Sequence, residues 1–240
     1  MSEEVAAETK GRPVRTGPKW ESEAQNRLRQ AIRKFAKPLA DLLARDANEG
    51  DTRLLVTDFL CEGLGFDKYE HLTTEYAVKG EFADYGIRLD KQLVAFIEVK
   101  RTTTKLSERH LRQVEMYAVN EGVEWMILTN GISWQAYHLA PGMPVEIDLT
   151  VDVNLLSDGT VPQKANSLFP LTLESLKRRQ IDELWKAKRA TSPKSLATVL
   201  CTEPVLEIVK RELRRATGHM VDTAELGRLL KETVIRSDCL

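Results

Sequence analysis

The sequence predicts an α/β fold, in which helices flank a mixed central sheet. Three segments carry apolar side chains at helical spacing, and five short segments are apolar or alternating runs bounded by turn residues. These helices and strands are expected over residues 20–47, 48–62, 72–78, 82–89, 93–99, 107–121, 124–128 and 133–139. The order of two helices, three strands, a helix and two strands favours one sheet covered by helices.

The segment 93–99 predicts a strand buried on both faces, because it is apolar except for Glu98. Lys100 follows directly after it. Side chains alternate between faces along a strand, so Glu98 and Lys100 point the same way whereas Val99 points the other. An unpaired charge in such a place is costly, which indicates that the two charged groups serve a function.

The preceding strand contains Asp84, although aspartate is disfavoured in strands. If residues 90–92 form the hairpin loop, Leu89 faces Leu93 and Asp84 lies opposite Glu98. Facing carboxylates repel one another and need a compensating cation. Hard divalent cations such as Mg²⁺ take carboxylate oxygens as ligands, and a neighbouring lysine can orient water or stabilise charge on phosphorus. The sequence therefore predicts a metal site on one face of the sheet.

These residues resemble a known family. Asp84 followed by Glu98-Val99-Lys100 resembles the D…E-x-K signature of the PD-(D/E)XK nuclease superfamily. The segment 48–67, NEGDTRLLVTDFLCEGLGFD, resembles the opening of the nuclease domain of type I restriction enzyme restriction subunits, where an N-E-x-x-T-[KR] start precedes an apolar helix. Glu81 to Ile87 and the L-T-N-G-I-x-W at 128–134 continue the resemblance in the family's order. It implies a restriction-endonuclease-like sheet of four to five strands, to which the chain adds helical N- and C-terminal extensions.

The resemblance implies a Mg²⁺-dependent endonuclease that hydrolyses DNA phosphodiester bonds in restriction or phage defence, with Mn²⁺ as an alternative ion. Asp84, Glu98 and the Val99 carbonyl would ligate the metal. Lys100 would position or activate the attacking water, and Glu49 would orient Lys100 or ligate a second ion. The competing interpretations are a favourable acid in the first turn of a helix for Glu49, and simple ion pairs for the other charged residues.

A second motif follows the E-x-K strand. Gln113 and Tyr117 are spaced to share one side of a helix and match the Q-x-x-x-Y of a subset of this superfamily. The resemblance implies that Gln113 contacts the DNA backbone or holds the metal-site geometry, supported by Tyr117; the alternative is a core tyrosine with a polar neighbour. Four nearby basic residues are candidates for phosphate contacts, namely Arg101, Lys105, Arg109 and Arg112.

Composition limits the classes of function. A formal net charge of −1 gives no overall attraction to nucleic acid, so DNA contact requires local basic patches. The three cysteines form no C-x-x-C pair, which argues for a reducing compartment and against a zinc site or disulfide framework. No apolar run approaches about 18 residues and the acidic start is not a signal peptide, so a cytoplasmic protein without a membrane partner is expected.

The chain is expected to comprise a disordered tail (1–19), a nuclease-like domain (20–150) and a helical C-terminal extension (151–240). Pro38 is expected to break or kink the first helix, and 145–153 is a candidate edge strand. The extension has helices expected near 173–188, 203–217 and 223–235, and would either grip duplex DNA or mediate dimerisation.

No Walker-type loop is present, so no helicase motor is encoded here. An active nuclease would therefore work alone, as a homodimer suited to double-strand cleavage, or with a separate helicase or translocase or other restriction-modification subunits. The main alternative is a catalytically idle nuclease fold that binds DNA or a partner, and a purely structural protein is the third hypothesis. The intact set of Asp84, Glu98 and Lys100 favours the enzyme, because an idle site has no evident need for three desolvated charges.

Overall fold

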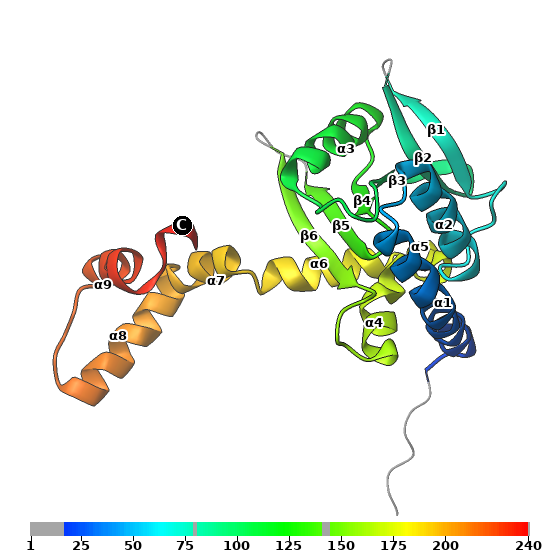
Figure 1. Cartoon of the computed structure of the whole chain (residues 1–240). Coiled ribbons are helices and arrows are strands. Elements are labelled where there is room, and N and C mark those ends of the chain that lie inside the picture. Colours follow the sequence, from blue (N-terminus) through cyan, green and yellow to red (C-terminus); the bar gives the residue numbers. More distant parts are fainter. Residues whose placement is uncertain (1–16, 79–80, 141–144, 240) are drawn as a thin grey trace, which may run out of the picture.

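The computed structural model describes residues 17–78, 81–140 and 145–239, and in them six strands form one mixed sheet (Figure 1). The strands lie in sequence order and are β1 (Leu72–Val78), β2 (Glu81–Leu89), β3 (Gln92–Val99), β4 (Trp125–Thr129), β5 (Ser133–Ala140) and β6 (Glu146–Asn154). The pair β3–β4 is parallel and the other neighbours are antiparallel. The expectation of four to five strands was too low, because the candidate edge strand pairs with β5 along its whole length.

Helices cover both faces of this sheet. They are α1 (Lys19–Ala44), α2 (Glu49–Glu62), α3 (Glu108–Glu121), α4 (Val161–Leu168), α5 (Leu173–Lys177), α6 (Gln180–Ala190), α7 (Pro193–Leu200), α8 (Glu203–Thr217) and α9 (Thr223–Leu229), with short 3-10 turns at Phe169–Leu171 and Ser237–Cys239 and a π-helical turn at Leu230–Val234. One core lies between the sheet and α1, α2 and α4 to α6, and a second lies between the sheet and α3. Helix α3 is the crossover that joins the parallel strands β3 and β4.

The β2–β3 hairpin turns on two residues instead of the expected three. Asp90 and Lys91 both have positive φ, 49° and 67°, which is the backbone of a type I′ turn. Leu89 therefore pairs with Gln92, and the expected pairing of Leu89 with Leu93 was wrong.

A bulge shifts the register by one residue between Ile87 and Arg88, where Val94 of β3 has no partner in β2. Beyond it Tyr85 pairs with Ile97, which is the last pair of the two strands before Asp84. Asp84 accepts a hydrogen bond from the Val99 N–H and its charge acts on Glu98, so the two carboxylates lie near one another, whereas their direct opposition stays a prediction.

Pro38 was expected to break or kink the first helix, and it does not break it, because α1 is continuous through Pro38. A proline inside a helix costs about 3 kcal/mol because it removes one hydrogen bond and crowds the preceding turn. Leu28 and Phe35 before it and Leu39 and Leu42 after it are buried on one face of α1. Each such burial stabilises by roughly 1.5–3 kcal/mol, so packing on both sides of Pro38 outweighs its cost.

The segment after β6 packs into the main core. Leu168, Leu171 and Ile181 are buried in the same cluster as α1 and α2, and the expected domain boundary at 150 falls inside β6. The single helix expected over 173–188 is divided into α5 and α6 at Arg179, whose φ of 54° is left-handed. Of the expected tail 1–19, residues 1–16 lie outside the described part of the chain, and α1 begins at Lys19.

We call residues 17–190 the body and residues 193–239, which hold α7 to α9, the arm. Figure 1 shows the arm extending away from the body beyond α6. Within the described residues, no helix is both long and apolar enough to cross a membrane.

Candidate active site

The structure brings Asp84, Glu98 and Lys100 together where β2 and β3 pair. The Lys100 ammonium donates to Glu98 Oε1 at 2.5 Å, and the Glu98 side chain is only 5% exposed. Lys100 is held by its backbone as well, since its N–H donates to the Thr129 carbonyl at the end of β4. The predicted carboxylates and lysine therefore form one half-buried cluster at this end of the sheet.

Asp84 is fixed by two donors. Its Oδ2 accepts a hydrogen bond from the Val99 N–H at 2.7 Å, and its Oδ1 accepts from Arg53 Nη1 at 2.9 Å. The alternation of β2 changes at Asp84, because Tyr85 packs in the core under α2 whereas Ala83 packs in the core under α3. This irregularity accompanies a carboxylate that reaches both the neighbouring strand and a helix.

Arg53 was not among the predicted site residues. It lies in the first two turns of α2, and its side chain is 35% exposed. The available signal was the basic residue that ends the N-E-x-x-T-[KR] start of that helix. Since its guanidinium pairs with Asp84, Arg53 places a positive charge directly beside one of the two predicted metal ligands.

Glu98 has an environment unusual for a carboxylate. Burial raises the pKa of Glu98, the hydrogen bond and charge of Lys100 oppose this, and the negative charges of Asp84 and Glu49 raise it further. Its Oε2 is buried and has no hydrogen-bond partner among the described residues. An unsatisfied buried oxygen of this kind costs about 1–3 kcal/mol or more, and a bound cation would remove that cost.

Glu49 lies in the first turn of α2, after the N-cap Asn48, whose side chain accepts from the Asp51 N–H. Glu49 is half-buried, and its negative charge acts on Glu98. The position suits both interpretations of Glu49, as a helix-start acid and as a residue at the edge of the site.

His110, in the first turn of α3, also lies near the cluster and was missed. Burial lowers the pKa of His110, as do the positive charges of Lys100 and Arg109, while Glu49 raises it. Its Nδ1 lies 3.3 Å from Ser107 Oγ, and the side chain of Ser107, at the N-cap position of α3, makes no capping hydrogen bond. The only sequence signal was its place three residues before Gln113, on the same side of the helix.

The Q-x-x-x-Y residues are placed unequally. Tyr117 is fully buried in the core under α3, with its ring 6.3 Å from that of Phe96. Gln113 belongs to α3, but its side chain lies outside the described part of the chain. Its role in DNA contact or site geometry stays a prediction.

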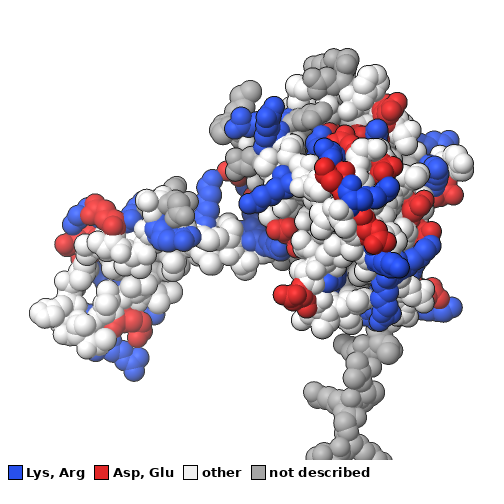
Figure 2. All heavy atoms as spheres, viewed as in Figure 1, with Lys and Arg blue, Asp and Glu red and all other residues white. Residues whose placement is uncertain are grey.

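The four basic candidates are exposed. Arg101 donates to the Asp46 carboxylate and to the carbonyls of Asp46 and Ala47, so it ties the segment after β3 to the α1–α2 loop. Lys105, Arg109 and Arg112 lie in or before α3 on the surface. On the visible face of the body, Figure 2 shows basic and acidic side chains interspersed, and phosphate contacts by these four residues stay a prediction.

Helix α2 and the turn between β4 and β5 anchor the loop that follows Lys100. The Thr52 and Thr102 hydroxyls hydrogen-bond at 2.9 Å, which links this loop to α2. Asn130 donates to the carbonyls of Thr102 and Thr104 and accepts from the N–H groups of residues 132 and 133. The T-N-G-I turn therefore connects β4 to β5 and also fixes the segment 102–104 that follows Lys100.

The carboxylate oxygens of the cluster are the type of ligand that a hard cation such as Mg²⁺ prefers. Within the described residues there is no cluster of three or more His, Cys, Asp or Glu side chains that could hold a metal ion. Mg²⁺, however, often takes one or two carboxylates and completes its shell with waters and substrate phosphates. Asp84 and Glu98, with a buried Glu98 oxygen lacking a partner, fit that smaller requirement. A ligand role for the Val99 carbonyl stays a prediction.

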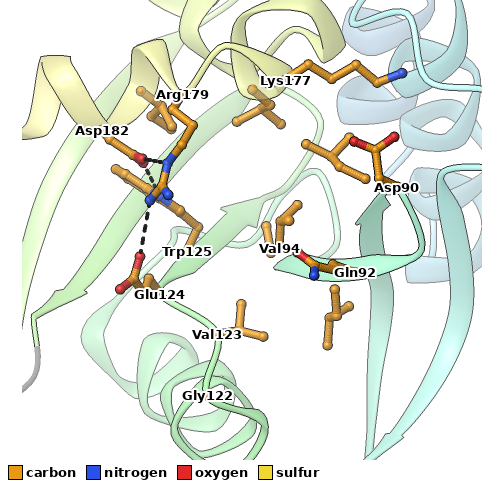
Figure 3. Close-up of a pocket in the computed structure, with 15 residues that line it drawn as sticks. Asp90, Gln92, Val94, Gly122, Val123, Glu124, Trp125, Lys177, Arg179 and Asp182 are labelled. Carbon is orange, nitrogen blue, oxygen red and sulfur yellow. Dashed lines mark hydrogen bonds and ion pairs between the residues drawn. The ribbon is translucent and has the colours of Figure 1, made fainter.

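A separate pocket of about 340 Å³ lies at the other end of β3 (Figure 3). Arg179 pairs there with Asp182 and Glu124, and Trp125 Nε1 donates to Asp182 at 2.9 Å. These interactions join α6 to the start of β4, where Trp125 pairs with Ala95 of β3, roughly 10 Å along the strand from Glu98. None of the predicted site residues lines this pocket.

Residues 48–147 match the family model described as the type I restriction enzyme R protein N terminus. The family so described is that of a PD-(D/E)XK nuclease-like domain, and the match covers 100 of the 240 residues. It runs from the N-cap of α2 into β6, and contains all the predicted site residues together with Arg53 and His110. No curated protein and no solved structure matches the chain. The resemblance inferred from Asp84 and the E-x-K strand is confirmed by the family match.

Proposed function

We propose that the protein is a Mg²⁺-dependent endonuclease of a restriction or phage-defence system, acting on DNA in the cytoplasm. The observation that carries the proposal is the buried Glu98 oxygen without a partner, beside Asp84 and Lys100, in a domain of a restriction-enzyme family. A nuclease of this kind needs carboxylates able to hold a metal ion, and a positively charged side chain near the scissile phosphate. The cluster has both.

Each side chain has a distinct task in this proposal. Asp84 and Glu98 would hold Mg²⁺, which when bound lowers the pKa of water and neutralises phosphate charge. Lys100 is oriented by Glu98 and would donate to the attacking water or to a phosphate oxygen on which negative charge develops. Arg53 holds the Asp84 carboxylate in one orientation, and its partly exposed guanidinium can also face a phosphate.

The environment of Glu98 gives the activity a pH dependence. Its pKa is raised by burial, so Glu98 takes up a proton at a higher pH than an ordinary carboxyl group. Protonation removes both a metal ligand and the partner of Lys100. Activity is therefore expected to fall as the pH drops through the raised pKa of Glu98.

Cleavage of supercoiled plasmid and linear DNA in Mg²⁺ and in Mn²⁺ tests the proposal. Wild type should nick or linearise the plasmid, and Lys100→Ala should reduce the rate at least about a hundredfold. Lys177→Ala is the matched control, because this exposed lysine borders the separate pocket and lies in no predicted site. Wild-type-like cleavage by Lys100→Ala would overturn the mechanism.

A second candidate is a catalytically idle module that binds DNA or a partner. The observation in its favour is that both oxygens of Asp84 already accept hydrogen bonds, from Arg53 and from the Val99 N–H. An enzyme that acts only with a separate motor or other restriction-modification subunits would also be inactive alone. Metal-dependent thermal stabilisation distinguishes the two, since a nuclease awaiting its partner still binds Mg²⁺ whereas an idle module does not.

A further inference from the structure

The arm is joined to the body through α6 and a group of ion pairs. Arg189 at the end of α6 binds Glu146 and Asp148 of β6, and Lys194 at the start of α7 binds Glu146 at 2.8 Å. Beyond α7, helix α8 packs on α7 and α9 within the arm (Figure 1). The base of the arm is therefore held against the sheet edge while α8 and α9 project into solvent.

The arm has a very small interior. Its buried apolar residues, among those described, are Ala197, Leu206, Leu226 and Cys239. Helical units of about 40–60 residues with so little core are marginal alone and are commonly completed by oligomerisation. The arm therefore lacks enough buried surface of its own to account for three ordered helices.

The arm, which buries few apolar residues, also exposes many apolar side chains. In the described chain, seven large hydrophobic residues are exposed on the 47-residue arm, as many as on the whole body: Leu196 (49%), Val199 (55%), Leu200 (44%), Ile208 (51%), Met220 (67%), Leu229 (37%) and Val234 (69%). Figure 2 shows a face of the arm on which uncharged residues separate charged groups near its ends. So dense a set on a soluble chain marks an interaction surface.

Helix α7 carries the clearest stripe. Leu196, Val199 and Leu200 have the i, i+3, i+4 spacing of one helical face, while Ala197 turns into the interior. The exposed area of the seven side chains is on the order of 700 Å², close to the ~800 Å² that each partner contributes to a stable interface. One arm therefore presents the apolar area that half of a dimer needs.

We propose that the arm is a homodimerisation element, in which the apolar stripe of α7 and the exposed apolar residues of the segment 203–234 pack against the same surface of a second copy. A two-fold axis lets one patch serve both partners. This interface would be independent of whether the site in the body cleaves DNA.

The charges of the arm favour a second copy over DNA. The arm contains eight Lys or Arg and seven Asp or Glu, a net charge of +1, so two arms do not repel strongly. Several of its cations are paired in place, including Arg228 with Glu232, Lys210 with Glu207 and Arg215 with Glu212. A DNA-gripping surface needs unpaired cations on one face, and of the two alternatives open from sequence, dimerisation has the better support.

Sedimentation velocity of the full chain, from about 1 to 100 µM, tests the proposal, because a micromolar dimer dissociates in this range. The mass measured for wild type at high concentration should be that of a dimer, twice the 27.2 kDa of one chain. Val199 is 55% exposed, so a glutamate fits there without disturbing the interior of the arm. Val199→Glu should raise the dissociation constant of the dimer at least about tenfold and leave the helicity unchanged. The matched control is Leu54→Glu, the same change at a 67% exposed leucine of the body, which should leave the dimer intact.

Three results would overturn the proposal: a monomeric wild type at 100 µM, a Val199→Glu dimer of unaltered affinity, or equal dissociation by Leu54→Glu. DNA affinity should be measured in parallel. A Val199→Glu chain that loses DNA affinity without a change in mass would also contradict dimerisation through the arm.

Discussion

Lys100→Ala tests the electrostatics of the site independently of catalysis. The substitution leaves the Glu98 carboxyl 5% exposed, next to Asp84 and without its ammonium partner. A buried carboxylate in that position either stays charged at a high cost or takes up a proton. The loss of stability should therefore depend on pH.

The sign follows from the proton balance. The pKa of Glu98 in the folded chain is raised by burial, so the folded state binds more protons than the unfolded state. The stability from protonated Glu98 is present below the unfolded pKa and is lost as the pH rises through the folded pKa. Lys100 lowers that folded pKa, so its removal moves the loss to higher pH.

Removing one partner of a buried ion pair costs about 3–5 kcal/mol, and Lys100, at 16% exposure, is not fully desolvated. We therefore expect Lys100→Ala to cost about 3 kcal/mol at pH 8. At lower pH, proton uptake by Glu98 replaces the lost charge interaction, so the cost should be smaller at pH 5 than at pH 8.

Urea unfolding at several pH values in EDTA measures these differences. The double variant Lys100→Ala/Glu98→Gln supplies the control, because it carries no buried charge and should lose most of the pH dependence. An equal cost at pH 5 and pH 8, or a double variant no more stable at pH 8 than Lys100→Ala, would refute the reasoning.

Three further predictions concern the metal, the α6 contact and one turn. Mg²⁺ or Mn²⁺ should raise the melting temperature of wild type and leave Asp84→Ala unchanged; a shift that persists in the variant would place the ion elsewhere. Trp125→Phe should cost about 1–2 kcal/mol in thermal unfolding, because the Asp182 carboxylate loses a buried donor, and an unchanged melting temperature would contradict that hydrogen bond. Gly131→Ala should destabilise more than Gly122→Ala: both have positive φ, but a Cβ at Gly131 meets Leu39 at 2.9 Å and one at Gly122 meets open space, so equal losses in urea would argue against this packing.

The strands and their order could be predicted because they depend on local patterns. Apolar runs bounded by turn residues located the five strands of the expected core, and the E-x-K segment marked the end of β3. The hairpin shows the limit of this reasoning. Its two-residue turn and the bulge that follows depend on pairing across the sheet, so local patterns predicted a loop of the wrong length.

The site could be predicted only in part. Residues on adjoining strands are related by register, which is why Asp84, Glu98 and Lys100 could be placed on one cluster. Arg53 and His110 come from helices on opposite faces of the sheet, and their approach depends on how α2 and α3 pack. No spacing in the sequence encodes such a distance.

The sequence by itself determined which residue types the chain offers for chemistry and where its helices and strands begin. Tertiary structure alone decided that Pro38 stays inside one helix and that the main core extends to Ile181. It also decided that the arm exposes its apolar side chains. The physical reason is that burial is a property of surfaces brought together in space, and its free energy outweighs local preferences that a sequence pattern can express.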